Sequence, residues 1–572
     1  FKNGELKLKP ITILLGANSV GKSSIINLLL MLQQTARVSN YKSAFRLHGE
    51  NVSLGECENI FRNKVKNNDI VVGFEFESPQ LTNLLQTKLF EDLIERIIDP
   101  IRFLYMRSMR SARSIKTHNR RDFKDYFPKE IYDYINDMKS LGDIPMSKDL
   151  FMSLIDGLTH INNELGSIKE TSDDYIRYYF RRGYHNYHSS RETLETIFDY
   201  LSALRLLDES IFNMTFDCIC LNVKGEDTIK LKTFIIKSLD KEILNVKFDY
   251  ALDSGFYKDV KIHSDFSSKE LLSEKNSKQQ FIKLLNHNST IFSWMDPYDE
   301  QYRDFYFEDV DNDINTIDTK IVSQIIGISL SSIRRNFTKE LVNHVSPLRA
   351  HPKRYYFLDN ANINTSINTL DGNSLTEVLK ENAKVRAKVN EWLDKFDLQV
   401  NVSTLQDIIH KLKIRQYALD LDITDVGFGI SQILPIIVQG FLSFKNSLTM
   451  IEQPEIHLHP KMQADLADLF IDIVNKGESI SGEFDNAQKY LLIETHSEYL
   501  LRRLRRRIAE GKISSEDVAI YFLEHPDDGQ SGTIINEKTI SSNGYFDWPQ
   551  DFYAKELLND TTEFIKQSFR NL

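Results

Sequence analysis

The sequence predicts an α/β fold in which the two ends of the chain build a parallel sheet around a large, mainly helical insertion. Three observations lead to this prediction. Residues 11–15 form a buried-strand run that leads directly into an apolar helix at residues 24–33. Later, the apolar runs 448–451 and 490–493 are each followed by a polar turn and an amphipathic helix, and a further strand is expected at 518–523. Between these parts, residues from about 80 to 340 show helical spacing instead.

These changes in pattern divide the chain into four expected parts. They are an N-terminal lobe at 1–80, a mainly helical insertion at 81–340, a C-terminal lobe at 341–525 and a tail at 526–572. In the N-terminal lobe, further strands are expected at 6–8 and 71–76. In the insertion, helices are expected at 84–98, 131–141 and 194–207.

The composition is that of a globular protein without a membrane span. Apolar residues make up 41 % of the 572 residues, and the longest apolar stretch, 25–32, has the length of a buried helix. Acidic side chains outnumber basic ones by 82 to 71, so any nucleic-acid contact needs a local basic patch. Cys57, Cys218 and Cys220 form no regular framework, which favours a reducing, cytoplasmic location. Because the chain begins with Phe1 rather than Met, we expect a few native residues before it and leave targeting there unread.

A phosphate-binding loop is predicted between the first strand and its helix. The segment from Gly16 to Ser23 matches G-x-x-x-x-G-K-[ST], with the required strand before it and helix after it. In such a loop the backbone N–H groups and the helix N-terminus bind phosphate, the lysine reaches the β- and γ-phosphates, and the serine hydroxyl ligates Mg²⁺. The alternative is a chance match in an ordinary strand–helix turn. The residues expected to bind ATP are Gly16, Asn18, Ser19, Val20, Gly21, Lys22, Ser23 and Ser24.

Acidic and histidine residues follow two of the C-terminal strands. Glu452, Gln453 and Glu455 come directly after residues 448–451, and Glu452 is expected to hold Mg²⁺ together with Ser23. His496 follows residues 490–493, where a histidine facing a γ-phosphate can hydrogen-bond it. For His496 alone, an ordinary core or surface histidine is the competing interpretation.

A second candidate anion site precedes the acidic strand. Gly427, Gly429, Ser431 and Gln432 lie at the expected start of a helix, where backbone N–H groups bind anions. The competing interpretation is a helix cap with turn glycines.

The order of these four elements resembles the ATP-binding-cassette (ABC) ATPases of the SMC and overcoming-lysogenization-defect (OLD) group. The resemblance implies an ABC-type ATPase head in which residues 16–24 are the Walker A loop, 425–432 the signature, 450–455 Walker B, 457–460 the D-loop region and His496 the switch histidine. It also implies ATP and Mg²⁺ as cofactors and a homodimer or higher oligomer, in which the signature of one subunit closes over the ATP of the other.

Further segments are similar to ATPases of bacterial antiphage systems. These are residues 346–356, residues 372–400 and residues 544–552, and they most resemble the PtuA ATPase subunits of Septu-type systems, including retron-associated ones. The resemblance implies a separate nuclease subunit of the HNH type as partner, and for retron-associated systems a reverse transcriptase with its RNA and DNA.

One departure from the family pattern concerns the rate of hydrolysis. Most cassette ATPases place a catalytic glutamate directly after the Walker B acid, but this sequence has Gln453 there. We therefore expect slow hydrolysis, with Glu455 as a second candidate for orienting water. An ATPase that acts directly on DNA in repair, and a scaffold that binds ATP without hydrolysing it, are the alternatives.

The remaining residue clusters do not predict a specific reaction. No Toprim nuclease domain fits into the residues after His496, and a metal site at His185 and His188 or in the acidic segment 296–314 lacks supporting ligands. The Asp-Asp-Gly segment at 527–529 is interpreted as a turn rather than as a pair of metal ligands. Three basic clusters could contact nucleic acid or form solvated helix faces: residues 107–121, residues 175–184 and residues 502–507. The second cluster could instead contact a protein partner, and the third could belong to a helix packed next to the strand before His496. In the tail, Phe546, Trp548, Phe552 and Tyr553 either anchor a partner or pack on the chain's own core.

Overall fold

The chain folds into two compact units in a computed structural model. The first unit combines residues 1–33 with residues 336–572, and the second covers residues 34–335. The two ends of the chain therefore build one unit together, and the middle builds the other. The structure describes residues 1–110, 127–129, 131, 146–167, 189–251, 253–285, 288–295, 316–338, 340–357, 367, 372–406, 408–417, 419–475, 488–526, 532–547 and 554–570.

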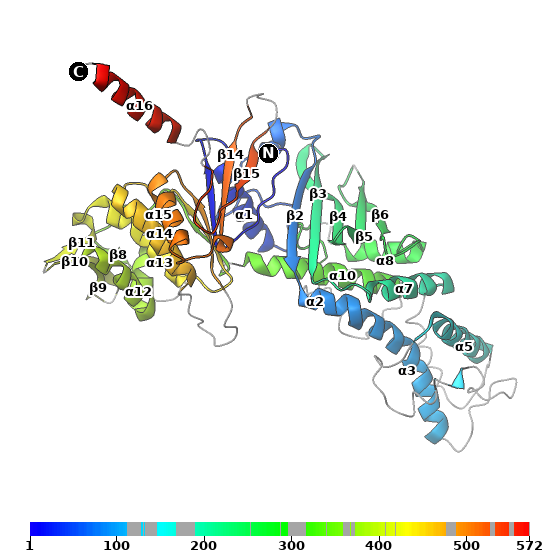
Figure 1. The fold of residues 1–572 in the computed structure, drawn as a ribbon. Coiled ribbons are helices and arrows are strands. Elements are labelled where there is room, and N and C mark those ends of the chain that lie inside the picture. The colour runs from blue at the N-terminus through cyan, green and yellow to red at the C-terminus, as the bar shows by residue number, and fades with distance from the viewer. Residues whose placement is uncertain are drawn as a thin grey trace. The chain divides into compact units, whose positions relative to one another are not determined.

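The first unit is built on a six-stranded sheet (Figure 1). Its neighbouring strands are parallel except for the antiparallel pair at one edge, β14 and β15. Every side chain of β1 is buried, as expected for a parallel strand that is covered on both faces. The strand order is β15 (Ile534–Lys538), β14 (Val518–Glu524), β1 (Ile11–Gly16), β13 (Tyr490–Glu494), β12 (Leu448–Glu452) and β7 (Val342–Val345).

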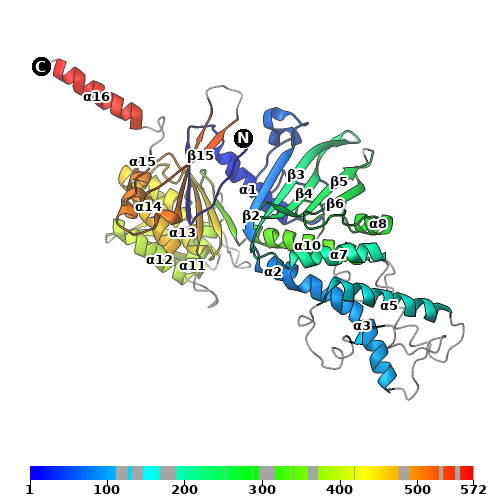
Figure 2. The same ribbon diagram turned by 45° about the vertical axis from the view of Figure 1, so that its right-hand side comes forward.

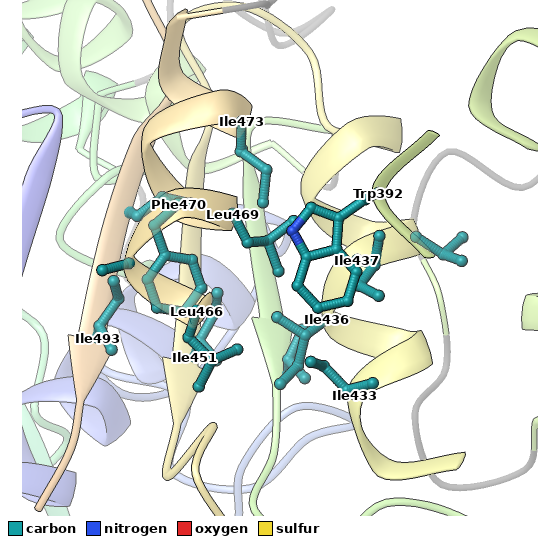
Figure 3. Packing of buried hydrophobic residues seen from close by; sticks show 14 of the residues in the cluster. Trp392, Ile433, Ile436, Ile437, Ile451, Leu466, Leu469, Phe470, Ile473 and Ile493 are labelled. Atoms are coloured by element: carbon teal, nitrogen blue, oxygen red, sulfur yellow. The ribbon is translucent and has the colours of Figure 1, made fainter. Parts of the chain in front are cut away.

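Helices bury the apolar faces of this sheet. Figure 3 shows side chains of α13 and α14 packed together beside Ile451 of β12 and Ile493 of β13. Full burial of one such side chain contributes about 1.5–3 kcal/mol. The two helices approach closely at Gly440, where an added Cβ would lie 2.3 Å from the Cδ1 atom of Ile473. The helices of this unit are α1 (Lys22–Ala36, which continues into the second unit), α11 (Asn373–Glu381), α12 (Ala383–Leu393), α13 (Phe428–Leu442), α14 (Pro460–Asn475), α15 (Glu498–Ala509) and α16 (Ala554–Arg570).

A smaller antiparallel sheet completes the first unit. The strand β10 (Ile409–Gln416) pairs with β9 (Leu398–Gln406), β11 (Leu419–Asp422) and β8 (Tyr356–Phe357). Its apolar side chains and those of α11 and α12 belong to the same buried cluster as the large sheet.

The second unit is an antiparallel sheet with helices beside it. The strands follow chain order: β2 (Ile70–Glu77), β3 (Ile211–Val223), β4 (Glu226–Ser238), β5 (Lys241–Tyr250) and β6 (Tyr257–His263). Aromatic side chains fill its core, among them Phe234 and Trp294 with ring centroids 5.1 Å apart. Figure 2 shows α7 and α10 running beside this sheet. The helices are α2 (Pro79–Asn83), a π-helical turn (Leu84–Lys88), α3 (Leu89–Arg110), α5 (Lys148–Ser167), α7 (Arg191–Leu204), α8 (Lys275–Leu284) and α10 (Ile317–Arg334).

The predicted fold class is confirmed, but two details of the division differ. The N-terminal lobe was expected to extend to residue 80, whereas the N-terminal part of the first unit ends at Gln33. The expected strand in this lobe, β2, pairs along its full length with β3 of the second unit. The insertion was expected to be mainly helical, and it also contains β3 to β6.

Among the smaller predictions, the strands at 11–15, 71–76, 448–451, 490–493 and 518–523 and the helices at 84–98 and 194–207 are found. Residues 6–8 form no strand; instead, the Lys7 backbone N–H donates to the Tyr521 hydroxyl (2.9 Å). Several predictions fall outside the described residues: the helix at 131–141 beyond its first residue, His185 and His188, segment 296–314, the turn at 527–529, and Trp548, Phe552 and Tyr553. No helix in the described part of the chain is both long and apolar enough to cross a membrane.

Candidate active site

The predicted site residues other than those of the signature lie at one edge of the large sheet, because its central strands are parallel. β1, β13, β12 and β7 all end at this edge, and in the register Glu494 lies beside both Leu14 and Glu452. The phosphate-binding loop, the segment around His496 and the turn after Glu452 therefore come together from distant parts of the sequence.

The loop after β1 has the backbone that phosphate binding requires. Gly16 has φ +142°, and an added Cβ would lie 2.3 Å from the Leu523 carbonyl oxygen. Ser19 and Gly21 also have positive φ, +62° and +104°. Val20 is buried, and its carbonyl accepts a hydrogen bond from the Thr533 hydroxyl (2.8 Å).

The exposed part of the loop comprises Asn18 and Ser19 at its tip and Ser23 and Ser24 at the start of α1. The Ser24 N–H donates to the Gly21 carbonyl (3.1 Å), which closes the first turn of the helix. The loop therefore leads into a helix N-terminus, which is a favourable place for a phosphate.

Lys22 is held inside the loop. Its Nζ donates to the carbonyls of Gly16 (3.0 Å) and Ala17 (2.8 Å) and lies 3.9 Å from Oε1 of Glu494. Burial lowers the pKa of Lys22, while Glu494 and Glu455 oppose that shift. The Ser23 hydroxyl donates to Oε2 of Glu494 (2.9 Å). The lysine and the serine predicted to serve phosphate and Mg²⁺ thus share one carboxylate partner.

Three carboxylates approach this edge, each in a different environment. Glu452 contacts Nε2 of His344 through Oε1 (2.7 Å). Glu494 is only 4 % exposed, and burial raises its pKa against the lowering effects of Ser23 and Lys22. Glu455 accepts from the Thr495 hydroxyl (2.8 Å) and from the His496 N–H (2.7 Å), and burial raises its pKa.

The turn after β12 is fixed by a buried arginine. Gln453 has φ +44°, and its N–H donates to the Glu494 carbonyl (2.8 Å). Nη2 of Arg349 donates to the carbonyls of Glu452 (2.8 Å) and Gln453 (3.3 Å). Burial lowers the pKa of Arg349 to about 10, and its Nε and Nη1 have no partner among the described residues.

His496 has one ring nitrogen without a partner. Its Nε2 is buried and unpaired in the described part of the chain, and burial together with nearby Lys22 lowers its pKa. A buried polar atom without a partner is costly, so this nitrogen and the two of Arg349 are suited to an added oxygen-rich ligand.

The predicted signature lies against the turn after β12. Gly427 is the N-cap residue of α13, and a Cβ there would meet nothing within 4 Å. A Cβ on Gly429 would lie 2.9 Å from the His457 carbonyl oxygen, so Gly429 allows the helix to pack on this turn. Ser431 and Gln432 are buried in the first turns of α13. Glu494 thus links the Walker A loop to Gln453, and Glu455 in turn accepts from the His496 N–H. The signature approaches this group at His457.

The oxygen ligands and positively charged groups at this edge fit a nucleotide with Mg²⁺. Mg²⁺ prefers oxygen ligands and is usually held by one or two carboxylates together with substrate phosphates. Ser23 with Glu452 or Glu494 offers such a set, and Lys22 and the loop N–H groups offer positive charge to phosphates. When bound, the metal ion neutralises charge that develops on the phosphates.

Glu494, Arg349, His344 and Thr533 also contact the site, although no sequence motif predicts a role for them. Two signals could have identified the first pair: Glu494 ends a buried strand directly before Thr495-His496, and Arg349 follows a short strand at the same sheet edge. His344 and Thr533 reach the site through side-chain hydrogen bonds, to Glu452 and to the Val20 carbonyl, and the sequence around them carries no such signal.

The arginine cluster at 502–507 is explained by helix packing. Arg503 and Arg507 of α15 form ion pairs with Asp468 of α14, and Arg505 donates to the Gly544 carbonyl. Arg502 and Arg506 pair with Glu498 and Glu510. This cluster is therefore already paired within its own unit, which favours the helix-packing interpretation. The side chains of the other two basic clusters lie outside the described residues.

Comparison with known proteins agrees with this geometry. A search of curated proteins found no match. A family model described as an AAA ATPase domain matches residues 1–501, which include every predicted site residue. The chain therefore belongs to the AAA ATPase domain family and is an ATP-binding P-loop ATPase of the SMC/OLD-like type.

Proposed function

We propose that this chain is a slow ATPase that pairs head to tail with a second copy when ATP is bound and thereby regulates a separate nuclease in antiphage defence. One observation carries the ATP part of the proposal: Lys22, Ser23, Glu452, Glu494 and His496 meet at a single sheet edge. The remaining parts of the proposal rest on the arguments below.

Slow hydrolysis follows from the side chain at position 453. An amide cannot accept a proton from an attacking water, and Gln453 occupies the place of the usual base. Glu455 is a poor substitute, because both of its oxygens already accept hydrogen bonds from Thr495 and His496. We expect turnover below the roughly 1–10³ s⁻¹ that is typical of enzymes.

Pairing of two copies is supported by the start of α13. Gly427 has free space around it and precedes a helix whose first N–H groups lack intrahelical partners. A phosphate held by the loop of another copy fits such a helix N-terminus.

Two observations support regulation of a separate nuclease. Two segments resemble ATPases of antiphage systems, and the grouped side chains suit ATP rather than cleavage of a nucleic acid. Residues 346–356 and 544–552 resemble ATPases of Septu-type and retron-associated systems. The grouped side chains serve phosphate and Mg²⁺. The proposed partners are an HNH nuclease and, in a retron-associated system, a reverse transcriptase with its nucleic acid.

The experiment that tests the proposal measures mass and ATP hydrolysis together. The wild type should double in mass with ATP, and Lys22→Ala should not, because it removes the fixed positive side chain of the loop. Lys384→Ala is the control, since Lys384 is an exposed lysine on α12 of the same unit. Doubling without any hydrolysis would support the scaffold alternative, and hydrolysis stimulated by DNA alone would support the repair alternative. Co-purification with the product of the neighbouring gene tests the partner.

A further inference from the structure

We propose that Glu494 is a carboxylate of the Mg²⁺ site and that its contacts with Lys22 and Ser23 compete with phosphate for the lysine. This inference rests on the proposed ATP function and assigns a residue beyond the predicted pair, Ser23 and Glu452.

The order of the strands places Glu494 nearer to the loop than Glu452. β1 pairs directly with β13, and β12 is the next strand outward. Neighbouring strands lie about 4.8 Å apart, so the backbone at Glu452 is roughly 10 Å from β1.

The contacts of Glu494 are those expected of a metal-site carboxylate. The Ser23 hydroxyl, which ligates Mg²⁺ in loops of this type, already donates to Oε2 of Glu494 at 2.9 Å. Mg²⁺–oxygen distances are about 2.1 Å. An ion bound to Ser23 therefore lies within reach of Glu494, either directly or through one water of its shell.

The charge balance also favours a divalent ion here. Glu494 lies beside Glu452 in the sheet register. After burial, the negative charges of Glu452 and Glu455 also raise the pKa of Glu494. Like charges at close range are unfavourable without a cation. Lys22 supplies part of that positive charge, with its Nζ 3.9 Å from Oε1 of Glu494. When phosphates engage Lys22, the carboxylates lose this partner, so ATP binding should depend strongly on Mg²⁺.

The test compares ATP affinity in EDTA and in Mg²⁺ by calorimetry. We expect Mg²⁺ to increase the ATP affinity of the wild type. In E494Q, this increase should be about 10- to 100-fold smaller. In EDTA, E494Q should bind ATP at least as tightly as the wild type, because no carboxylate competes for Lys22. E537Q, at an exposed glutamate of β15, should behave like the wild type.

The outcomes separate this inference from the proposed function. A wild type that binds no ATP would overturn the proposed function. The role of Glu494 would be overturned if Mg²⁺ tightens ATP binding equally in the wild type and in E494Q, while E452Q loses this effect. If E494Q does not fold, E494D retains the charge on a shorter side chain and should lose part of the gain; an unchanged gain in E494D would be equally decisive against the inference.

Discussion

Gly16 is the loop residue least tolerant of a side chain. In Gly16→Ala, the new Cβ would lie 2.3 Å from the Leu523 carbonyl oxygen, and alanine rarely adopts φ +142°. We expect the loop to shift, ATP binding to be lost and stability to fall by about 1–3 kcal/mol. ATP titration and thermal unfolding measure the two effects. Gly511→Ala is the matched control, because Gly511 also has positive φ (+69°) but an open surrounding.

Gln453 sets the rate of hydrolysis in the proposed mechanism. Gln453→Glu restores a group that can accept a proton, so phosphate release should become faster than in the wild type. A rate that stays equal or falls would show that no attacking water lies at this turn.

Glu455 is assigned to positioning by its contacts. It bonds the Thr495 hydroxyl and the His496 N–H, so Glu455→Gln replaces one acceptor by a donor and should destabilise this segment by about 1–3 kcal/mol. A hydrolysis rate that is unchanged in this variant excludes Glu455 as the base.

At the scale of elements, the C-terminus of α13 depends on a buried lysine. Nζ of Lys489, just before β13, donates to the carbonyls of Gly440 (2.9 Å) and Phe441 (3.2 Å), which the helix itself leaves unpaired. Burial lowers the pKa of Lys489 to about 8, although the ammonium group caps the helix.

This shift predicts how stability depends on pH. Between the folded pKa of about 8 and the unfolded value of 10.5, the unfolded chain binds more protons, so the contribution of Lys489 rises with pH and is lost as pH falls through 8. We expect the free energy of unfolding of the wild type to gain about 1 kcal/mol over Lys489→Met between roughly pH 7 and 9. Denaturant unfolding of both proteins at each pH measures this difference. A constant difference would contradict the prediction.

The elements around the site and two helices of the insertion could be predicted, whereas strands β3 to β6 of the insertion could not. β1, β12, β13 and β14 are short apolar runs next to recognisable motifs, and burial on both faces makes such runs visible in the sequence. β3 to β5 alternate buried residues with Lys, Asn and Asp, a half-exposed pattern that was not distinguished from the helical spacing around it.

For the whole molecule, the limits of sequence reasoning come from pairing between distant segments. β2 was predicted as a strand, but only its pairing with β3, more than a hundred residues later, shows which unit it joins. The role proposed for Glu494 likewise depends on β13 lying between β1 and β12. Motif spacing identified Lys22, Glu452 and His496, but it could not give the order of the strands that carry them.

The described part of the tail contains both buried and exposed apolar side chains. Phe546, expected as an anchor or as core, is 1 % exposed and lies under the guanidinium of Arg505, so it packs on its own unit. In α16, by contrast, Phe564 is 71 % exposed and Ile565 47 %. Removal of residues 554–572 should therefore weaken capture of the neighbouring gene product while ATP binding stays intact.

The division of labour between ATPase and nuclease gives the last prediction. The side chains grouped at the sheet edge are suited to phosphate and one metal ion, whereas phosphodiester cleavage needs a further metal site built from paired carboxylates or from histidine with aspartate or asparagine. No group of three metal-ligating side chains is present among the described residues. We expect the purified chain, with ATP and Mg²⁺ or Mn²⁺, to leave DNA and RNA intact, and cleavage to appear once the partner is added. A gel assay with the chain alone, the partner alone and both together measures this. Nuclease activity that survives stringent purification and disappears when a carboxylate of this chain is changed would refute the division.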